Sequence, residues 1–375
     1  MLERFHVPHD EEIRIEYSEL RRLSVEILIK SGMNKKHAEI ASDVLLKADV
    51  RGVDTHGVSN MLRNYVQYFN EGSANPRPNW KITRETESCA TVDSDKGLGV
   101  VVVPLCMEIA IEKAKKTGVG LVSIGNGRHL GMAAYHAMMA LDHDMIGTCM
   151  TSSTTNVVPT HAAIPGIGTN PIAVAAPALK KAPFVFDAAT SAIATNKVRV
   201  AQRIGVPLAP GWITDEKGNP IMVDTPLKQS DDPNDVAGIM QTPVGATREL
   251  GSHKGFSLGM VVDILGSILN GSLAGPLRTF KAHQNHFVAA YSIDAFTELN
   301  KFKEMMDEYL QILEDLPPVE GQKRVLYAGL MEEETTIERM EKGIPLHPEV
   351  VNWFKDICSE LSINFDITGK GVRDA

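Results

Sequence analysis

Residues 89–132 read CATVDSDKGLGVVVVPLCMEIAIEKAKKTGVGLVSIGNGRHLGM, and this stretch carries the clearest fold signal in the chain. Its first residues, 89–95, predict a short strand, the apolar run 101–116 predicts a helix, and 120–124 predict a buried strand. Further strands are expected at 146–150, 172–176 and 184–186. Strands that alternate with helices predict a layered α/β fold, and the short connections also permit mixed strand pairing.

The flanking segments differ from this central region. Residues 17–51 predict two helices separated at Gly32, and 61–69 predict another. Residues 217–249 are rich in Asp, Pro, Gly and Thr, which predicts a long surface excursion. Towards the C-terminus, a strand is expected after Phe287 and helices at 302–313 and 350–361.

Composition excludes several classes of protein. The 375 residues carry a net charge of −9 with scattered lysines and arginines, whereas nucleic-acid binders need a basic face to neutralise phosphates. The charged N-terminus does not resemble a secretion signal, and no run reaches the roughly 20 apolar residues of a membrane span. Four cysteines without a CxxC pair predict free thiols in a reducing compartment. We therefore expect a cytoplasmic protein that binds neither nucleic acid nor membranes.

The usual dinucleotide fingerprint, GxGxxG, is missing. Its nearest match is IGNGRHLGM (124–132), in which Gly125, Gly127 and Gly131 miss the spacing that brings backbone up to a pyrophosphate. By this criterion alone the chain is not a Rossmann-type protein.

Two histidines in glycine-rich turns are the first candidates for chemistry. His56 lies in RGVDTHGVSN (51–60) just after a helix, and His129 lies in GNGRHLGM (125–132) at the end of a predicted strand. Glycine lets backbone approach a ligand, and a neutral imidazole can take a proton from an alcohol and return it. Either histidine could instead be a turn residue that bonds to backbone. Metal binding is not expected, because the sequence offers no tight cluster of further ligands.

Three other polar features suit an anionic or hydroxyl-bearing ligand. The loop 151–156, which includes Ser153, can supply hydroxyl and backbone donors to phosphates, or it is an ordinary polar loop. Lys254 precedes an apolar helix, where it would favour an anion unless it is simply exposed. Asp187 ends a strand and could accept bonds from a ribose or cap the next helix.

Taken together, several motifs resemble the malate/L-lactate dehydrogenase superfamily, which is unrelated to the Rossmann lactate and malate dehydrogenases. The blocks follow one another in the expected order from about residue 17 to the C-terminal region. They are RGVDTHGV (51–58), GNGRHLGMAAYHA (125–137), VVPTHAAIPGIGTNPIAVAAP (157–177), FVFDAATSAIATNK (184–197), GVPLAPGWITDEKGNP (205–220) and GSHKGFSLGMVVDILGSILNG (251–271).

The resemblance implies a fold and a quaternary structure. It implies a non-Rossmann α/β fold with a mixed, largely antiparallel sheet flanked by helices, which would explain the missing fingerprint. It also implies a homodimer with the site near the subunit interface. Residues 1–85, expected to be helical, would pack with 290–375 as a substrate and dimerisation domain, and 86–289 would bind a nicotinamide cofactor.

The resemblance also assigns residues to roles. The catalytic histidine falls on His129, and the histidine of the (S/T)HG motif falls on His56. Contacts to NAD or NADP would fall on Ser153, Asp187, Ala188, Ala189, Lys254 and Gly329.

This sequence departs from the family pattern at positions near the substrate. Many members carry an arginine four residues after the HG-motif histidine, suited to a substrate carboxylate, and here that residue is Asn60. Arg63 could substitute for it, as could Arg51 or Arg128. Thr154 stands where some members carry an acidic residue. Ala328 replaces the proline that usually precedes the final glycine motif.

The implied activity is reversible hydride transfer between NAD(P) and a small 2-hydroxy acid, with His129 as acid and base and His56 orienting the substrate. Two other functions stay open: a reductase for an imine beside a carboxylate, and a nucleotide-binding protein without catalysis. The sequence leaves the choice between NAD and NADP open.

Overall fold

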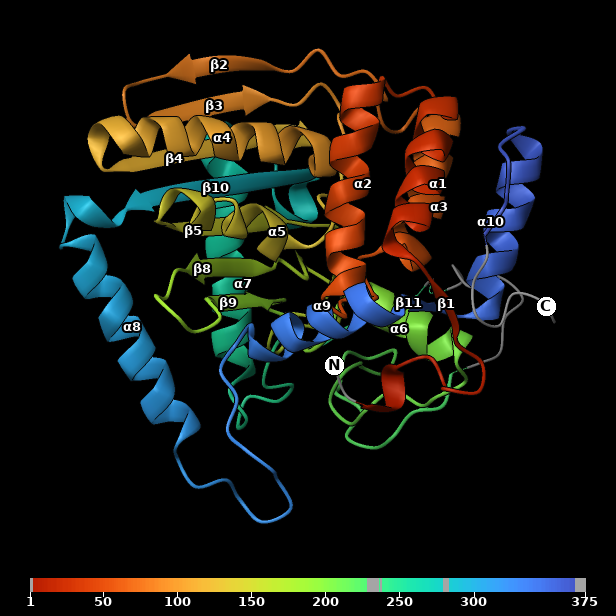
Figure 1. The fold of residues 1–375 in the computed structure, drawn as a ribbon. Helices are drawn as coiled ribbons and strands as arrows, with labels where there is room; N and C mark the ends of the chain where they lie inside the picture. The colour runs from red at the N-terminus through yellow and green to blue at the C-terminus, as the bar shows by residue number, and fades with distance from the viewer. Residues whose placement is uncertain (1–2, 228–235, 237, 279–282, 368–375) are drawn as a thin grey trace.

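A seven-stranded sheet forms the centre of the computed structural model, which describes residues 3–227, 236, 238–278 and 283–367 (Figure 1). Strands β3 and β4 pair in parallel, and every other neighbouring pair in this sheet is antiparallel. The predicted mixed, largely antiparallel sheet is therefore confirmed. In spatial order the strands are β2 (Lys81–Glu85), β3 (Cys89–Asp93), β4 (Val119–Gly127), β10 (Gln284–Ser292), β5 (Met145–Ser152), β8 (Ile172–Ala176) and β9 (Phe184–Ala188).

Helices cover both faces of this sheet. Helices α4 (Gly99–Thr117) and α5 (Ala133–Met138) pack on one face, and α7 (Ser252–Gly266) packs on the other (Figure 1). Alternation along β4 shows the two faces, because successive side chains of a strand point to opposite sides. Val122 is fully buried in the core cluster that contains the side chains of α4, whereas Ser123 donates to the Leu265 carbonyl of α7 at 3.0 Å.

The beginning and the end of the chain pack together. A second apolar core joins α1 (Tyr17–Lys30), α2 (Lys35–Val50) and α3 (Val58–Asn70) to α10 (Pro348–Glu360). Strand β1 (Ile13–Ile15) pairs antiparallel with β11 (Ile344–Leu346) beside these helices. The remaining elements include α6 (Thr195–Arg203), α8 (Leu299–Glu314), α9 (Leu330–Lys342), β6 (Thr155–Val157) and β7 (Ile167–Gly168).

Some expected elements differ from those observed. Strand β2 lies within 1–85, a range expected to be helical. The sequence did not reveal this strand, because all its side chains are exposed and no alternating apolar pattern marks it. The sequence also predicts a helix over 131–141, but α5 begins only at Ala133, because Gly131 has a φ of +75°, outside the α-helical range. Part of the excursion at 217–249 lies outside the described residues, and the rest contains neither helix nor strand. Within the part of the chain that the structure describes, no helix is long and apolar enough to cross a membrane.

Candidate active site

Two buried histidines fix the backbone on either side of His129. Strand β4 ends at Gly127, and the turn that follows carries Arg128, His129 and Leu130. The Nε2 of His286 lies 3.0 Å from the Arg128 carbonyl, and the Nε2 of His136 lies 2.9 Å from the Leu130 carbonyl. Burial lowers the pKa of His286 to about 3 and that of His136 to about 4. Both rings are therefore neutral near pH 7 and act as fixed donors to these carbonyls.

The contacts of His129 select one tautomer of its ring. The backbone N–H of Gly131 donates to Nδ1 at 3.1 Å, and the Tyr65 hydroxyl lies 2.8 Å from the same nitrogen. Since an amide N–H can only donate, Nδ1 is an acceptor and Tyr65 also donates to it. Burial, with smaller contributions from His56, His286 and Arg199, lowers the pKa of His129 well below its ordinary value. The neutral ring therefore carries its proton on Nε2.

At the start of α3, the turn that carries His56 packs closely against Asp49. The carboxylate of Asp49 accepts the N–H of Val58 at 2.9 Å, and a Cβ on Gly57 would lie only 1.8 Å from the other carboxylate oxygen. Glycine is thus the one residue that fits beside Asp49. Thr55 Oγ1 lies 2.8 Å from Nδ1 of His56, and burial lowers the pKa of His56 to about 4. The motif expected to carry chemistry is therefore a rigid turn.

The two candidate histidines lie face to face. Their ring centroids are 5.7 Å apart, with 11° between the ring planes. Two pockets meet beside them, and His56 and Gly131 line both. We call the first the histidine pocket: it measures 310 Å³ and is lined by residues that include His56, His129, Ser153, Thr154, Asn196 and Arg199. The second, the aspartate pocket, measures 490 Å³ and is lined by residues that include Arg51, Asp187, Ala188, Ala189, Lys197 and Gly329.

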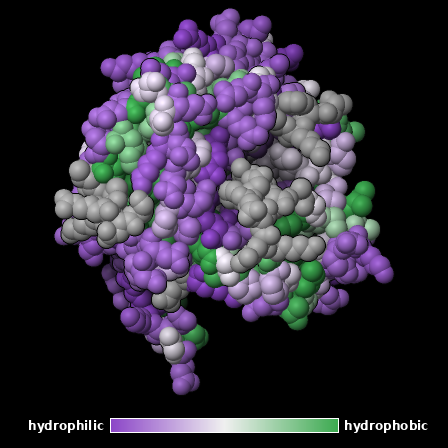
Figure 2. All heavy atoms as spheres, turned by 90° about the vertical axis from the view of Figure 1, so that its right-hand side faces the viewer, coloured by the Kyte–Doolittle hydropathy of each residue, from purple (hydrophilic) through white to green (hydrophobic). Residues whose placement is uncertain are grey.

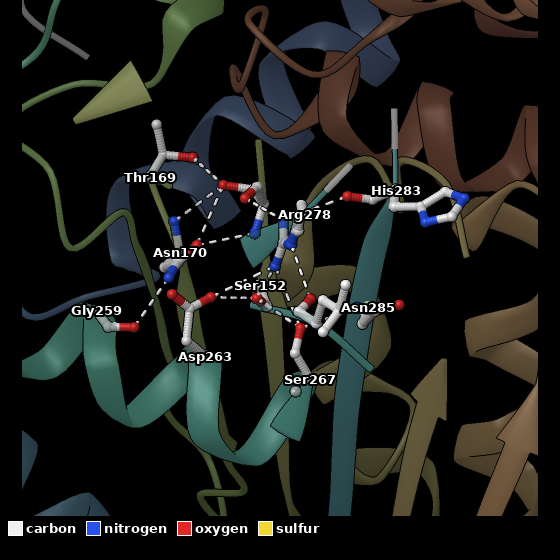
Figure 3. A network of polar contacts seen from close by, with 12 residues as sticks. Ser152, Thr169, Asn170, Gly259, Asp263, Ser267, Arg278, His283 and Asn285 are labelled. Atoms are coloured by element: carbon white, nitrogen blue, oxygen red, sulfur yellow. Dashed lines mark hydrogen bonds and ion pairs between the residues drawn. The ribbon is translucent and has the colours of Figure 1, made fainter. Parts of the chain in front are cut away.

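A buried polar network supports the Ser153 side of the histidine pocket (Figure 3). Arg278 donates to the Ser153 carbonyl and to Ser152, and it forms an ion pair with Asp263 of α7 at 3.4 Å. Asn170 accepts the Ser153 N–H at 2.8 Å. Burial raises the pKa of Asp263, although Ser152 and Arg278 oppose this effect. Because each group in this network has a partner, Ser153 is held rigidly at the wall of the pocket.

Asp187 reaches into the aspartate pocket and also caps a helix. Its carboxylate accepts the N–H of Ala134 at 2.7 Å, so it caps α5 rather than the next helix in sequence. Desolvation by the surrounding pocket raises the pKa of Asp187 to about 6, against the opposing effects of this bond and of Arg51. Gly329 lies where a Cβ would approach Val185 within 2.9 Å, and its φ is +99°. Ala188 and Ala189 complete this wall with small apolar side chains.

Three predicted site residues lie outside both pockets. Asn60 is 4% exposed and donates to the Asp54 carbonyl at 2.7 Å. Arg63 forms an ion pair with Glu349 at 2.6 Å and lies over the Trp353 ring. Asn60 and Arg63 thus bond to groups of the helical region and line neither pocket. Lys254 is exposed on α7 and lines neither pocket.

The cations that do line the pockets were not predicted as a group. Arg199 and Lys197 both lie on α6, which follows the predicted strand at Asp187, and burial lowers the pKa of Lys197 to about 8. Arg51 lines the aspartate pocket and bonds to Glu333 at 3.2 Å, whereas Arg128 is buried and bonds to the carbonyls of Ser73 and Gly127. In the sequence, Lys197 and Arg199 appear only as part of the charged run NKVR (196–199). No flanking glycine marks this run, and the sequence does not show which residues it faces.

The site contains the groups for proton transfer and for anion binding. Within the described ranges, no group of three or more His, Cys, Asp or Glu side chains is arranged to hold a metal ion. Two neutral imidazoles lie where a polar pocket meets a larger one, and each pocket has at least one cation. Such an arrangement can bind two ligands side by side and exchange a proton with one of them.

Comparison with known proteins agrees with this geometry. A family model for malate/L-lactate dehydrogenases matches residues 15–355. The chain is 36% identical over 356 residues to a malate dehydrogenase from Pyrococcus abyssi, which covers 94% of this chain and 96% of the relative. It is 30% identical over 351 residues to an L-sulfolactate dehydrogenase from Methanocaldococcus jannaschii, with 92% and 96% covered.

A solved structure extends this likeness to the fold. The malate dehydrogenase from Entamoeba histolytica matches with a TM-score of 0.88 at 29% identity, covering 95% of this chain and 99% of that one. As the ordered motifs predicted, the chain belongs to the malate/L-lactate dehydrogenase family, a family of hydroxyacid dehydrogenases.

Proposed function

We propose that this protein interconverts a small 2-hydroxy acid and the corresponding 2-oxo acid with NAD or NADP. The observation that carries the proposal is the pair of neutral imidazoles, His56 and His129, stacked where the two pockets meet. The 2-oxo or 2-hydroxy acid binds in the histidine pocket, and the cofactor binds in the aspartate pocket. Their reacting ends then meet beside His56.

The residues of the aspartate pocket fit a dinucleotide. Asp187 offers a carboxylate to ribose hydroxyls, Arg51 and Lys197 offer positive charge to phosphates, and Ala188 and Ala189 leave room for a flat ring. When bound, a nicotinamide supplies or accepts the hydride. Both an acidic and a basic group line this pocket, so its residues fit either NAD or NADP.

His129 exchanges the proton that accompanies the hydride. In reduction, the protonated ring gives its Nε2 proton to the carbonyl oxygen of the 2-oxo acid as the hydride arrives, and the ring becomes neutral. In oxidation the same nitrogen accepts the hydroxyl proton, which requires the proton to stand on Nδ1. Of the two partners of Nδ1, the Tyr65 hydroxyl can switch from donor to acceptor, whereas the Gly131 N–H cannot and must move away from a protonated Nδ1. His56 hydrogen-bonds the substrate oxygen and fixes its orientation.

Replacing His129 tests this function. His129→Gln should lower turnover about 10²–10⁴-fold, the usual contribution of acid–base catalysis, while NAD(P)H binding measured by fluorescence stays within a few-fold. The matched control is His143→Gln, which changes an exposed histidine in the 3-10 turn Leu141–His143. The assay uses a panel of 2-oxo acids and cyclic imino acids with NADH and NADPH.

The outcomes of this panel separate the proposed functions. Turnover of 2-oxo acids that collapses only in His129→Gln supports the proposal. Turnover confined to cyclic imino acids identifies an imine reductase instead. Cofactor oxidation that never exceeds background on any substrate indicates a nucleotide-binding protein without catalysis. Full activity in His129→Gln removes His129 from the mechanism.

We also propose that the protein is a homodimer that uses the outer face of α7. The inner face of this helix is made of small residues, because a Cβ on Gly255 would lie 2.6 Å from the Val244 carbonyl and one on Gly259 would lie 2.9 Å from Ile167. The outer face carries large apolar side chains that are 42–50% exposed: Leu258, Met260, Val261 and Ile264. By contrast, the side of the molecule to the right in Figure 1 is mostly hydrophilic (Figure 2).

A further inference from the structure

The histidine pocket contains one arginine that nothing in the sequence motifs assigned. Among the described residues that line this pocket, Arg199 is the only arginine, and no lysine lines it. A pocket that selects a 2-oxo or 2-hydroxy acid needs a group that binds the carboxylate, and a guanidinium does so with two parallel bonds. The position where many relatives carry such an arginine is Asn60, which does not reach the pocket.

The surroundings of Asn60 show why an arginine does not stand there. Asn60 Oδ1 accepts a bond from Arg203 at 3.2 Å, and Arg203 also bonds to the Ser59 carbonyl and to Glu349. The Arg203 side chain is only 8% exposed. A second guanidinium at position 60 would lose this acceptor and place two like charges together in a buried region. In this chain Arg203 of α6 therefore occupies the space beside the turn that carries His56 and Gly57.

Helix α6 directs successive turns to different partners. Thr195, Asn196 and Arg199 line the histidine pocket, and Arg203, one turn further along, points to Asn60 instead. Arg199 donates to Asn196 Oδ1 at 2.7 Å, and Asn196 Nδ2 donates to the Thr55 carbonyl at 2.7 Å. A short chain of bonds thus ties the guanidinium of Arg199 to the turn that carries His56.

The charge of Arg199 acts on the groups around the pocket. It contributes to the lowered pKa of His129, after the larger effect of burial, and it opposes the rise in the pKa of Tyr68 caused by burial. Both side chains line the histidine pocket. The positive field of Arg199 therefore extends into the space where the substrate would lie.

We infer that Arg199 binds the substrate carboxylate, so that α6 supplies the specificity-determining cation that many relatives carry on α3. This inference rests on the proposed function, because it names the group that makes the pocket selective for acids. The other arginines near the site are committed elsewhere: Arg51 lines the aspartate pocket, Arg63 pairs with Glu349, and Arg128 bonds to backbone carbonyls.

The test compares Arg199→Met with Arg84→Met, which removes one positive charge from an exposed position on β2. Two readouts are needed. The first is the affinity for oxamate, an unreactive 2-oxo acid analogue, measured by calorimetry on the enzyme with NADH or NADPH. The second is the ratio of kcat/KM for pyruvate to that for methyl pyruvate, its uncharged ester. We expect Arg199→Met to weaken oxamate binding about 10- to 100-fold and to lower the ratio by a similar factor.

Cofactor affinity should stay unchanged in Arg199→Met, and Arg84→Met should match the unmodified protein in both readouts. Should Arg199→Met fail to fold, Arg199→Lys carries the test: one ammonium in place of the planar fork should weaken oxamate binding by a smaller factor. Unchanged oxamate affinity and an unchanged acid-to-ester ratio in these variants would overturn the inference, as would an unmodified protein that does not bind oxamate.

The oxamate readout separates this inference from the proposed function. Oxamate binding that depends on Arg199, in a protein that turns over no 2-oxo acid, supports the carboxylate site and rejects the proposed activity. Turnover of 2-oxo acids with the same acid-to-ester ratio in Arg199→Met supports the activity and rejects the role of Arg199.

Discussion

The hydroxyl group of Tyr65 is the side-chain partner of Nδ1 of His129. Two other buried histidines, His136 of α5 and His286 of β10, bond through Nε2 to backbone carbonyls of the turn that carries His129, which can only accept. Tyr65 lies on α3, is fully buried, and meets Nδ1 of His129 at 2.8 Å. It touches neither pocket, so we regard it as a positioning residue for His129.

Tyr65→Phe should lower kcat/KM roughly 3- to 10-fold in both directions, because one hydrogen bond of about 1 kcal/mol is lost and the equilibrium constant is fixed. The hydroxyl donates to the neutral ring and favours it, so its removal should raise the pKa of His129. In the plot of kcat/KM against pH, the inflection caused by the titration of His129 should therefore move to higher pH. Steady-state kinetics between pH 5 and 9 measure both effects.

The control is Tyr135→Phe, which changes a half-buried tyrosine of the core that lines neither pocket. A slower Tyr65→Phe enzyme whose pH profile does not move would mean that Tyr65 only fills space.

Local sequence patterns reveal some residues of the site and miss others. His56 and His129 could be predicted because glycines flank each of them in sequence, and glycine signals a close backbone approach. Tyr65, Lys197 and Arg199 lie within helices and have no such local signal. Their positions depend on how α3 and α6 pack against the turn after β4, and that packing involves contacts between distant parts of the chain.

At the scale of elements, helices α3 and α6 contact each other through polar side chains. Arg203 of α6 and Asn60 of α3 form a bond at 3.2 Å, and Glu349 of α10 neutralises both Arg203 and Arg63. This contact fixes the orientation of α6, and with it the direction in which Arg199 points. Asn60 therefore supplies Arg203 with an acceptor that an arginine at position 60 would not provide.

Asn60→Arg should destabilise the protein by about 1–3 kcal/mol, because it overfills a buried site and sets a second guanidinium beside Arg203. Urea unfolding followed by circular dichroism gives the free energy. Asn79→Arg, at an exposed position, should have almost no effect. The double variant Asn60→Arg/Arg203→Asn should recover part of the loss, which a double-mutant cycle quantifies. A fully stable Asn60→Arg variant would show that α3 can carry the cation after all.

Elements with long apolar patterns were predictable, and short or exposed ones were not. The helices at 17–51 and the strands around β4, β5 and β8 match the expectations from periodicity. Strands β1 and β11 have three residues each, and β6 and β7 are at most as long, so they are too short for a pattern to emerge. Their pairing becomes visible only when the distant partner is in place.

At the scale of the whole molecule, two exposed apolar stripes have no partner within the described part of the chain. One is the outer face of α7, and the other runs along α8 through Met305, Tyr309 and Ile312, which are 56–59% exposed. Contiguous apolar patches of this kind mark interaction surfaces in proteins that do not aggregate. The inward-facing glycines of α7 pack closely and its large apolar side chains lie on the exposed side, which supports the proposed homodimer.

Ile264→Glu should therefore convert the proposed dimer to a monomer, because it buries a carboxylate at the centre of the α7 face. Light scattering after size-exclusion chromatography should give a mass of two chains for the unmodified protein and of one chain for the variant. The control Ile164→Glu changes a more exposed isoleucine, 71% against 49%, in the loop between β6 and β7. A single-chain mass for the unmodified protein at about 50 µM would contradict the dimer, because a stable homodimer binds more tightly than that.

The Ile264→Glu variant also tests whether dimerisation affects cofactor binding. Lys254 lies one helical turn before Leu258, on the side of α7 that carries the apolar face, yet it lines neither pocket of its own chain. If Lys254 contacts the cofactor, as the family motifs imply, the contact depends on how the second subunit closes this face. We therefore expect Ile264→Glu to weaken NAD(P)H binding as well, whereas Ile164→Glu should not. Monomers that bind the cofactor as tightly as dimers would place Lys254 outside the cofactor site.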